Sequence, residues 1–252
     1  MATQSEVVEI FPNPDTDPIP SGVRIGKLIH GLRIFGTDPT TGALGQGIEQ
    51  QMRFAFQNLQ RNVESVGGTL DNVAQVSVFL KNRQDLKALN PPWVEMFPND
   101  LNRPTYKFMQ ADLPGEQLVS LEAFALVGER RTTLQIPNVA HTNPIPMGVR
   151  IGNMLFSSRV LPYDAQTGQP PDTVERQAEC LFENVRTLLQ LAGAQPDHIT
   201  QGRLFVFDRA DLPLAEKHWH ALVGDPGPTL HTVHYGLAPA LKIMLELIAI
   251  IQ

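Results

Sequence analysis

The chain has 252 residues, a formal net charge of −6 and an apolar content of 42%. No run of residues approaches the roughly 18 consecutive apolar residues of a membrane span. The acidic charge, without a long basic run, argues against nucleic acid as the main partner. The N-terminus lacks the pattern of a secretory signal, and the one cysteine, Cys180, rules out an internal disulfide. We therefore expect a cytoplasmic protein that binds neither nucleic acid nor a membrane.

The sequence contains the same unit twice. Residues 17–29 read DPIPSGVRIGKLI, and residues 143–155 read NPIPMGVRIGNML at a constant offset of 126. The same offset relates Trp93 to Trp219, so the register continues well beyond the first motif. Because two copies are too few for a solenoid, we predict two domains. Their expected bounds are residues 1–127 and 141–252, with a linker over 128–140.

The first copy shows its elements in a clear order. Residues 22–36 (GVRIGKLIHGLRIFG) are typical of a strand, a turn and a second strand, and DPTTG at 38–42 is a turn. Over residues 48–66, apolar side chains recur every three or four positions, which predicts a helix. Gly67 ends it. Residues 72–80 (NVAQVSVFL) then predict a strand.

The second copy repeats this order. A helix is predicted over 174–192 and a strand over 198–207, followed by a short helix with Asp211 as its N-cap and Pro213 in its first turn. The final strand lies in ALKIMLELIAII (240–251). Since this strand is apolar on both faces, we expect its outer face to meet another domain or subunit.

This order predicts an α+β fold, in which a mixed six-stranded sheet carries two helices on one face. The sequence resembles the RidA (YjgF-type) family in four features. These are the hairpins, the DPTTG and DAQTG turns, the segment RPTYKFMQADLPGEQLVSLEAFAL (103–126) and four amide side chains on the long helices. The amides are Gln51, Asn58, Gln177 and Asn184. The resemblance implies two tandem chorismate-mutase-like domains, trimers of domains with clefts at their interfaces, and hydrolysis of reactive enamines and imines to keto acids and ammonia. We expect no cofactor.

The family's site residues are replaced in both copies. The resemblance implies an arginine that clamps the substrate carboxylate and a glutamate that handles proton transfer. The position of the arginine is occupied by Tyr106 and Leu230, and that of the glutamate by Ser120 and Met244. A tyrosine that the family has on its first strand is replaced by Ile19 and Ile145. A one-residue gap also admits Thr105 at the arginine position. The familiar site is therefore absent.

A new arginine follows the first hairpin in each copy. The family's serine–glycine pair becomes Leu32-Arg33 in the first copy and Ser158-Arg159 in the second. Because the planar guanidinium matches a carboxylate, Arg33 or Arg159 is predicted to replace the lost clamp and bind a small anionic metabolite. The other candidates are Glu122 and Glu246 as catalytic residues and Ser158, Tyr106 and Thr232 as substrate contacts.

Each of these candidates has a structural alternative. Arg33 and Arg159 could lie at the surface, paired with acidic neighbours such as Asp38 and Asp164. The two candidate glutamates could equally be polar residues of an interface.

The histidines of the second copy do not indicate a metal site. His218 and His220 lie two apart on a predicted helix, about 200° around its axis. His231 and His234 lie three apart on a predicted strand and so point to opposite faces. We expect no metal.

Two functions fit these observations. The first is a divergent RidA-like deaminase, a hydrolase of C–N bonds in a small anionic metabolite. The alternative is a non-catalytic small-molecule-binding pseudoenzyme that keeps the interdomain cleft. If domains assemble in threes, three chains fill two rings, which predicts a homotrimer. A pseudo-dimer, in which the two copies of one chain pair and no ring forms, is the alternative assembly.

Overall fold

A computed structural model of the chain describes residues 7–10, 20–225, 227–234 and 240–252. The chain divides into two compact units, Met1–Arg131 and Thr132–Gln252, and each is an α+β domain. Within the described ranges, no helix combines the length and the apolar composition that a membrane-spanning segment needs.

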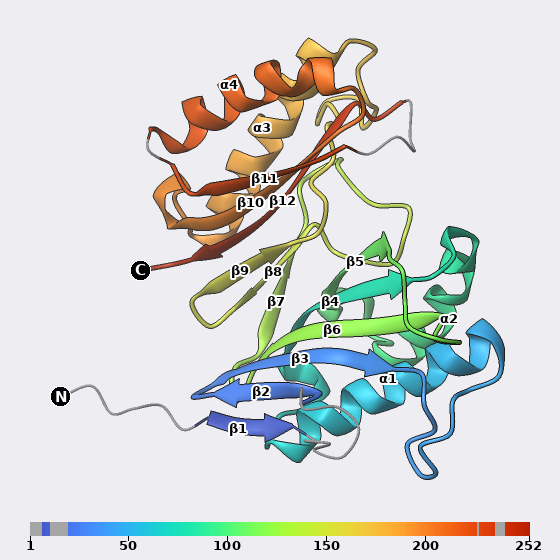
Figure 1. Cartoon of the computed structure of the whole chain (residues 1–252). Helices are drawn as coiled ribbons and strands as arrows, with labels where there is room; N and C mark the ends of the chain where they lie inside the picture. The colour runs from blue at the N-terminus through green and yellow to red at the C-terminus, as the bar shows by residue number, and fades with distance from the viewer. Residues whose placement is uncertain (1–6, 11–19, 226, 235–239) are drawn as a thin grey trace. The chain divides into compact units, whose positions relative to one another are not determined.

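In its described residues, the first domain contains six strands and two α-helices, shown in Figure 1 from blue to green. In chain order these are β1 (Val7–Ile10), β2 (Gly22–Ile25), β3 (Leu28–Phe35), α1 (Gly47–Ser65), β4 (Val73–Leu80), α2 (Asn90–Met96), β5 (Thr105–Gln110) and β6 (Val119–Leu126).

The second sheet and its helices, from green to red in Figure 1, repeat that order. Its elements are β7 (Arg131–Leu134), β8 (Gly148–Ile151), β9 (Met154–Ser157), α3 (Val174–Ala192), β10 (Ile199–Val206), α4 (Leu212–Val223), β11 (Thr229–His234) and β12 (Ile243–Ile250). β7 lies within the segment 128–140, where the sequence indicated a linker.

The two sheets have the same topology. Their strand orders are β1-β2-β3-β6-β4-β5 and β7-β8-β9-β12-β10-β11. Each is mixed, because β5 and β11 run parallel to the neighbouring strands β4 and β10 while the long closing strands run antiparallel. The predicted α+β fold with two six-stranded sheets is confirmed.

The long helices follow from their sequence patterns. In α3, Phe182, Val185 and Leu189 are among the buried residues of one stripe, as predicted. The Thr173 hydroxyl accepts a hydrogen bond from the Arg176 backbone N–H at the start of the helix. Gly193 ends it with φ 68°, a left-handed conformation that costs glycine little. The helix predicted over 174–192 is therefore confirmed.

One local expectation was wrong. The Asp211 side chain makes no capping hydrogen bond at the start of α4. Instead, the Asp208 carboxylate accepts from the Ala210 N–H and caps the 3-10 turn that leads into the helix. The final strand β12 lies between β10 and β9, so its backbone is paired on both sides.

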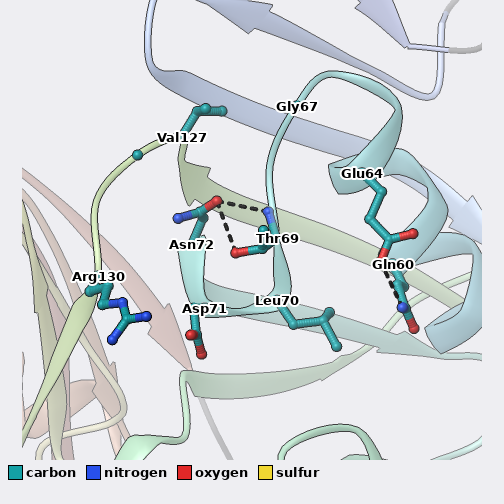
Figure 2. A pocket seen from close by; sticks show the side chains of 10 residues that line it. Gln60, Glu64, Gly67, Thr69, Leu70, Asp71, Asn72, Val127 and Arg130 are labelled. Atoms are coloured by element: carbon teal, nitrogen blue, oxygen red, sulfur yellow. Dashed lines mark hydrogen bonds between the residues drawn. The ribbon is translucent and has the colours of Figure 1, made fainter.

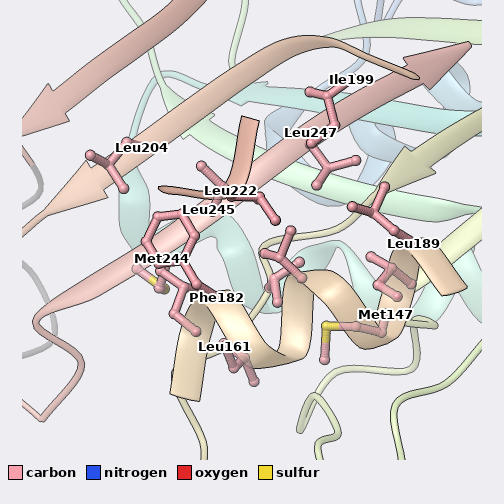
Figure 3. Close-up of a cluster of buried hydrophobic side chains, with 14 of the residues drawn as sticks. Met147, Leu161, Phe182, Leu189, Ile199, Leu204, Leu222, Met244, Leu245 and Leu247 are labelled. Atoms are coloured by element: carbon pink, nitrogen blue, oxygen red, sulfur yellow. The ribbon is translucent and has the colours of Figure 1, made fainter. Parts of the chain in front are cut away.

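Each domain encloses its own apolar core. In the second domain, residues from β12 and both helices form one cluster, and Figure 3 labels Leu245 and Leu247 of β12, Phe182 of α3 and Leu222 of α4. Trp219 of α4 belongs to the same cluster and has 2% of its surface exposed. Burial of this apolar area is the main stabilising contribution within the domain.

The four helix amides hold loops in place. Asn184 of α3 donates to the carbonyls of Leu161 and Tyr163, at 2.9 and 2.8 Å. Gln177 donates to the carbonyls of Pro171 and Ala240 and accepts from the Lys242 N–H. Asn58 and Gln51 of α1 make the matching bonds in the first domain. These amides satisfy buried backbone groups that no strand or helix pairs.

One arginine in each hairpin caps the long helix of its domain. Arg24 of β2 donates to the Val66 carbonyl at 2.6 Å, and Arg150 of β8 donates to the Ala192 carbonyl at 2.8 Å. The last carbonyls of a helix lack intrahelical partners and carry partial negative charge, which a guanidinium offsets. Both arginines therefore have a structural role that the sequence pattern alone did not indicate.

We expect Arg150→Gln to lower the free energy of unfolding of the second domain by about 1–2 kcal/mol, because it removes a charged hydrogen bond to the end of α3. Chemical denaturation measures this when it is followed by Trp219 fluorescence in a Trp93→Phe background, because Trp93 of the first domain would otherwise contribute to the signal. Arg209→Gln is the control, since it makes the same charge change at an exposed position of the same domain. A loss no larger than that of the control would contradict the capping role.

Candidate functional site

The arginine after the first hairpin lies in a β-bulge in both domains. In the first, Gly31 pairs with Ala123 and Ile34 with Leu121, so β3 has one more residue than β6 between these pairs. In the second, Phe156 pairs with Ile248 and Val160 with Leu245, which again leaves one extra residue. A bulge redirects the side chains of the strand that contains it. Arg33 and Arg159 fall in these bulges, in register with Glu122 and Glu246.

The register also assigns the faces of the second sheet. Gly202 of β10 approaches Trp219 of α4 so closely that an added Cβ would lie 2.5 Å from the indole ring. Because neighbouring residues of a strand alternate, Arg203 and Phe205 lie on the opposite face, here called the helix-free face. Arg203 pairs with Glu246 of β12, so the glutamate lies on the same face.

Glu246 connects two arginines on the helix-free face. Arg159 Nε lies 3.0 Å from Glu246 Oε1, and Arg203 Nη1 lies 3.4 Å from Oε2. The side chains of Arg159 and Glu246 are 11% and 6% exposed. The Arg159 guanidinium also lies over the Phe205 ring, 4.4 Å from its centroid. Removing charged groups from water is costly, so stability alone is a weak reason for this buried cluster.

A serine and a histidine adjoin this cluster. The Ser158 hydroxyl, which is fully buried, lies 3.0 Å from the Met147 carbonyl oxygen and 2.7 Å from Nε2 of the partly buried His141. Burial, and after it the positive charge of Arg159, lower the pKa of His141 to about 4. The imidazole is therefore neutral at neutral pH.

The corresponding site of the first domain differs in three ways. Leu32 replaces the serine, and Ser77 of β4 stands opposite Glu122 where the second domain has Arg203. Arg33 itself has φ 50°, a left-handed conformation that is strained for a residue with a side chain. Its guanidinium lies 5.6 Å from the centroid of the Phe35 ring.

The acidic neighbours considered as partners of these arginines have other roles. The Asp164 carboxylate lies 3.2 Å from Arg176 of α3. The Asp38 carboxylate accepts from the backbone N–H groups of Thr40 and Thr41, and these bonds lower its pKa. Both aspartates therefore shape the turns that contain them.

The other predicted residues are Tyr106 of the first domain and Thr232 of the second. Tyr106 is 3% exposed, its ring packs edge-on against Trp93 of α2, and its hydroxyl lies 2.8 Å from Asn90 Oδ1. Burial raises the pKa of this phenol. Thr232 is exposed on β11 and pairs with the core residue Leu204, which places it on the helix side of the sheet. Ile19 lies outside the described residues.

Among the described residues, no group of three or more histidine, cysteine, aspartate or glutamate side chains could hold a metal ion. His218 stacks on Phe182 of α3, with ring centroids 5.6 Å apart. In the register of β11, His231 pairs with Arg203 and His234 with Val206, so the two histidines lie on opposite faces. Cys180 is buried, and burial raises the pKa of its thiol.

A pocket of about 690 Å³ lies elsewhere, in the first domain (Figure 2). It is lined by α1, the turn before β4 and the chain that leaves β6. Asn72 shapes its wall by accepting hydrogen bonds from the Thr69 backbone N–H and hydroxyl, and Gln60 donates to Glu64 across one helical turn. None of the predicted site residues lines this pocket.

Sequence reasoning missed Arg203, Phe205 and His141. Arg203 had a signal, since it is the one charged residue in the otherwise uncharged strand ITQGRLFV. Phe205 could not be distinguished from a core residue. His141 had no signal, because it lies outside the regular elements, and only the fold brings it to Ser158.

Both halves of the chain are similar to proteins of one known family. The model of the family described as Endoribonuclease L-PSP matches residues 17–127 and again residues 138–251. A RutC family protein of Pyrococcus abyssi is 28% identical over 127 residues, which cover 50% of this chain and 98% of that protein. The 2-iminobutanoate/2-iminopropanoate deaminase of Escherichia coli is 29% identical over 115 residues, covering 44% and 90%.

Among solved structures, the YjgF gene product of E. coli is 28% identical, with a TM-score of 0.44, covering 48% of this chain and 99% of that one. The family match spans most of the sequence and falls once on each domain. The chain therefore belongs to the Endoribonuclease L-PSP family, that of the YjgF and RidA proteins, and contains its domain twice.

Proposed function

We propose that the chain is a divergent deaminase of this family, which hydrolyses a C–N bond in a small imine or enamine that bears a carboxylate. The observation that carries the proposal is the partly buried group of Arg159, Glu246 and Arg203 on the helix-free face. The similarity to a 2-iminobutanoate/2-iminopropanoate deaminase supports the same class of substrate. Such a ligand carries the negative charge that a guanidinium recognises.

Arg159 is the proposed carboxylate clamp. Glu246 and the Phe205 ring hold its guanidinium in one orientation, so less conformational entropy is lost when a ligand binds. A planar guanidinium can pair with a carboxylate through two parallel hydrogen bonds, which orients the bound molecule as well as holding it. In this proposal Arg159 replaces the family's arginine, whose position is occupied by Leu230.

Glu246 is the proposed partner of the substrate nitrogen. Its carboxylate is positioned by Arg159 and Arg203 and can accept hydrogen bonds from an amino or imino group. In the hydrolysis, the oxygen of water bonds to the imine carbon and the nitrogen takes up the proton released. The C–N bond then breaks, and ammonia and an oxo acid leave.

We assign this reaction to the second domain. Ser77 and Leu32 replace Arg203 and Ser158 in the first domain, so the surroundings of Arg33 and Glu122 offer fewer polar groups to a ligand. Arg33 and Glu122 are proposed as a binding site without turnover.

The second candidate function is metabolite binding without catalysis. Met244 occupies the position of the family's glutamate in the second domain, and a thioether cannot transfer protons. A pseudoenzyme that keeps Arg159 would still bind carboxylates. The two functions differ in turnover.

We expect the protein to accelerate the hydrolysis of 2-imino acids, generated in situ by an amino-acid oxidase and followed by semicarbazide trapping. Arg159→Lys should reduce kcat/KM by about 100-fold, because an ammonium group cannot form the paired hydrogen bonds. Arg33→Lys should leave turnover nearly unchanged.

Arg209→Lys, at an exposed position, controls for the exchange itself. Carboxylate-induced melting shifts without any turnover would favour the binding protein over the enzyme. Turnover that survives Arg159→Lys in full would refute the clamp.

We also propose a homotrimer. Family clefts form between domains arranged in threes, and a chain with two domains needs three copies to complete two rings. Light scattering at low micromolar concentration should then give about 84 kDa, three times the chain mass of 27.9 kDa. A stable mass of one or two chains would exclude the rings.

A further inference from the structure

The pocket shown in Figure 2 is lined only by residues of the first domain. Its volume of about 690 Å³ falls within the roughly 300–1,000 Å³ of typical small-molecule sites. Figure 2 shows Gln60 and Glu64 of α1 on one side, Arg130 on the other and Asp71 between them. Charged side chains from three separate segments of the chain therefore line one cavity.

The two carboxylates of the lining are each held through one oxygen. Asp71 Oδ1 accepts a hydrogen bond from Asn102 Nδ2 at 3.2 Å and lies 3.8 Å from Arg131 Nη2. Glu64 Oε1 accepts from Gln60 Nε2 at 2.7 Å. Within the described part of the chain, Asp71 Oδ2 and Glu64 Oε2 have no hydrogen-bond partner. Each carboxylate therefore offers one oxygen to a donor of a ligand.

Arg130 brings the opposite charge to the pocket. Its side chain is exposed, and its guanidinium makes no hydrogen bond or ion pair with any described residue. The backbone around it is fixed, because Asn72 Nδ2 donates to the Glu129 carbonyl at 2.7 Å and Arg131 donates to the Leu70 carbonyl. Both neighbours of Arg130 are thus bound to the turn that contains Asp71, which lowers the entropic cost of binding a ligand between them.

The lining carries two negative charges and one positive charge, the complement of an amino acid with a basic side chain. We propose that this pocket is a binding site for a diamino carboxylic acid of the lysine type. Arg130 binds the α-carboxylate through paired hydrogen bonds, and Asp71 binds the α-ammonium. Glu64, on the opposite side, binds the ammonium of the side chain. Leu70 and Val127 are the apolar side chains of the lining, against which the methylene groups pack.

The second domain does not repeat this charge pattern. At the offset of 126, Gln190 occupies the position of Glu64, and Arg186 occupies that of Gln60. A positive charge there opposes the binding of a second ammonium group. We therefore assign the site to the first domain.

The experiment is an isothermal calorimetric titration of the full chain with L-lysine and three analogues at pH 7 and low ionic strength. Each analogue lacks one charged group of lysine: cadaverine lacks the carboxylate, 6-aminohexanoate the α-ammonium and L-norleucine the ammonium of the side chain. We expect L-lysine to bind and each analogue to bind about 10-fold more weakly or worse, because each loses one charge-assisted hydrogen bond. The result with 6-aminohexanoate tests Asp71 without any change to the protein.

Two variants test the walls of the pocket. Glu64→Gln should weaken the binding of L-lysine by about 10-fold and leave that of L-norleucine unchanged. Arg130→Gln should have the same effect on L-lysine and leave cadaverine unchanged. Both positions are exposed, and Glu116→Gln, at another exposed glutamate of this domain, controls for the change of charge.

The possible results are distinct. If L-lysine does not bind at millimolar concentration, there is no such site. Equal affinities for cadaverine and L-lysine would refute the role of Arg130 and leave a site for cations only. If L-lysine binds and neither Glu64→Gln nor Arg130→Gln weakens it, the ligand lies elsewhere and the assignment to this pocket is wrong. Turnover by the second domain is tested separately by Arg159→Lys, so neither proposal depends on the other.

Discussion

The chemistry of the second domain depends on the bulge that follows β9, between Phe156 and Val160. A bulge redirects the side chains of the strand that contains it, and Arg159 lies in this one. With it, the guanidinium lies against a carboxylate from β12 and over a ring from β10. Three strands that are distant in sequence thus contribute to one group because the bulge redirects one side chain.

The two domains share the hydrogen bonds that hold their loops and helix ends, but they differ in the residues around the arginine of the bulge. The helix amides and the hairpin arginines make the same bonds in both copies, since each satisfies a backbone group that would otherwise be buried without a partner. A change at those positions costs stability directly. The residues around Arg33 and Arg159 do not satisfy such backbone groups in both copies. The second copy therefore has Ser158 and Arg203 where the first has Leu32 and Ser77.

The cluster in the second domain combines groups that oppose one another energetically. Glu246 offsets the desolvation of Arg159 and Arg203, and burial, followed by the charge of Arg159, lowers the pKa of His141. The pairing of one buried glutamate with two arginines distinguishes the group from a simple surface ion pair.

Much of the fold could be predicted from the sequence by itself. The offset of 126 determined that there are two domains of one topology, and the apolar stripe ending at Gly193 determined α3, because helix period and left-handed glycine are local properties. The arginines at the bulges were also visible as departures from the family pattern. The local sequence pattern was enough to predict those elements whose structure depends on residues close together in the chain.

The partner of Arg159 was decided only by the tertiary structure. The sequence suggested Asp164, five residues away, yet that carboxylate binds Arg176, and Arg159 binds Glu246 at a separation of 87 residues. The strand order, which puts β12 between β9 and β10, and the bulge, which shifts the register by one residue, bring them together. Strand order and register depend on packing across the whole sheet, so no local stretch of sequence could reveal which side chains would meet.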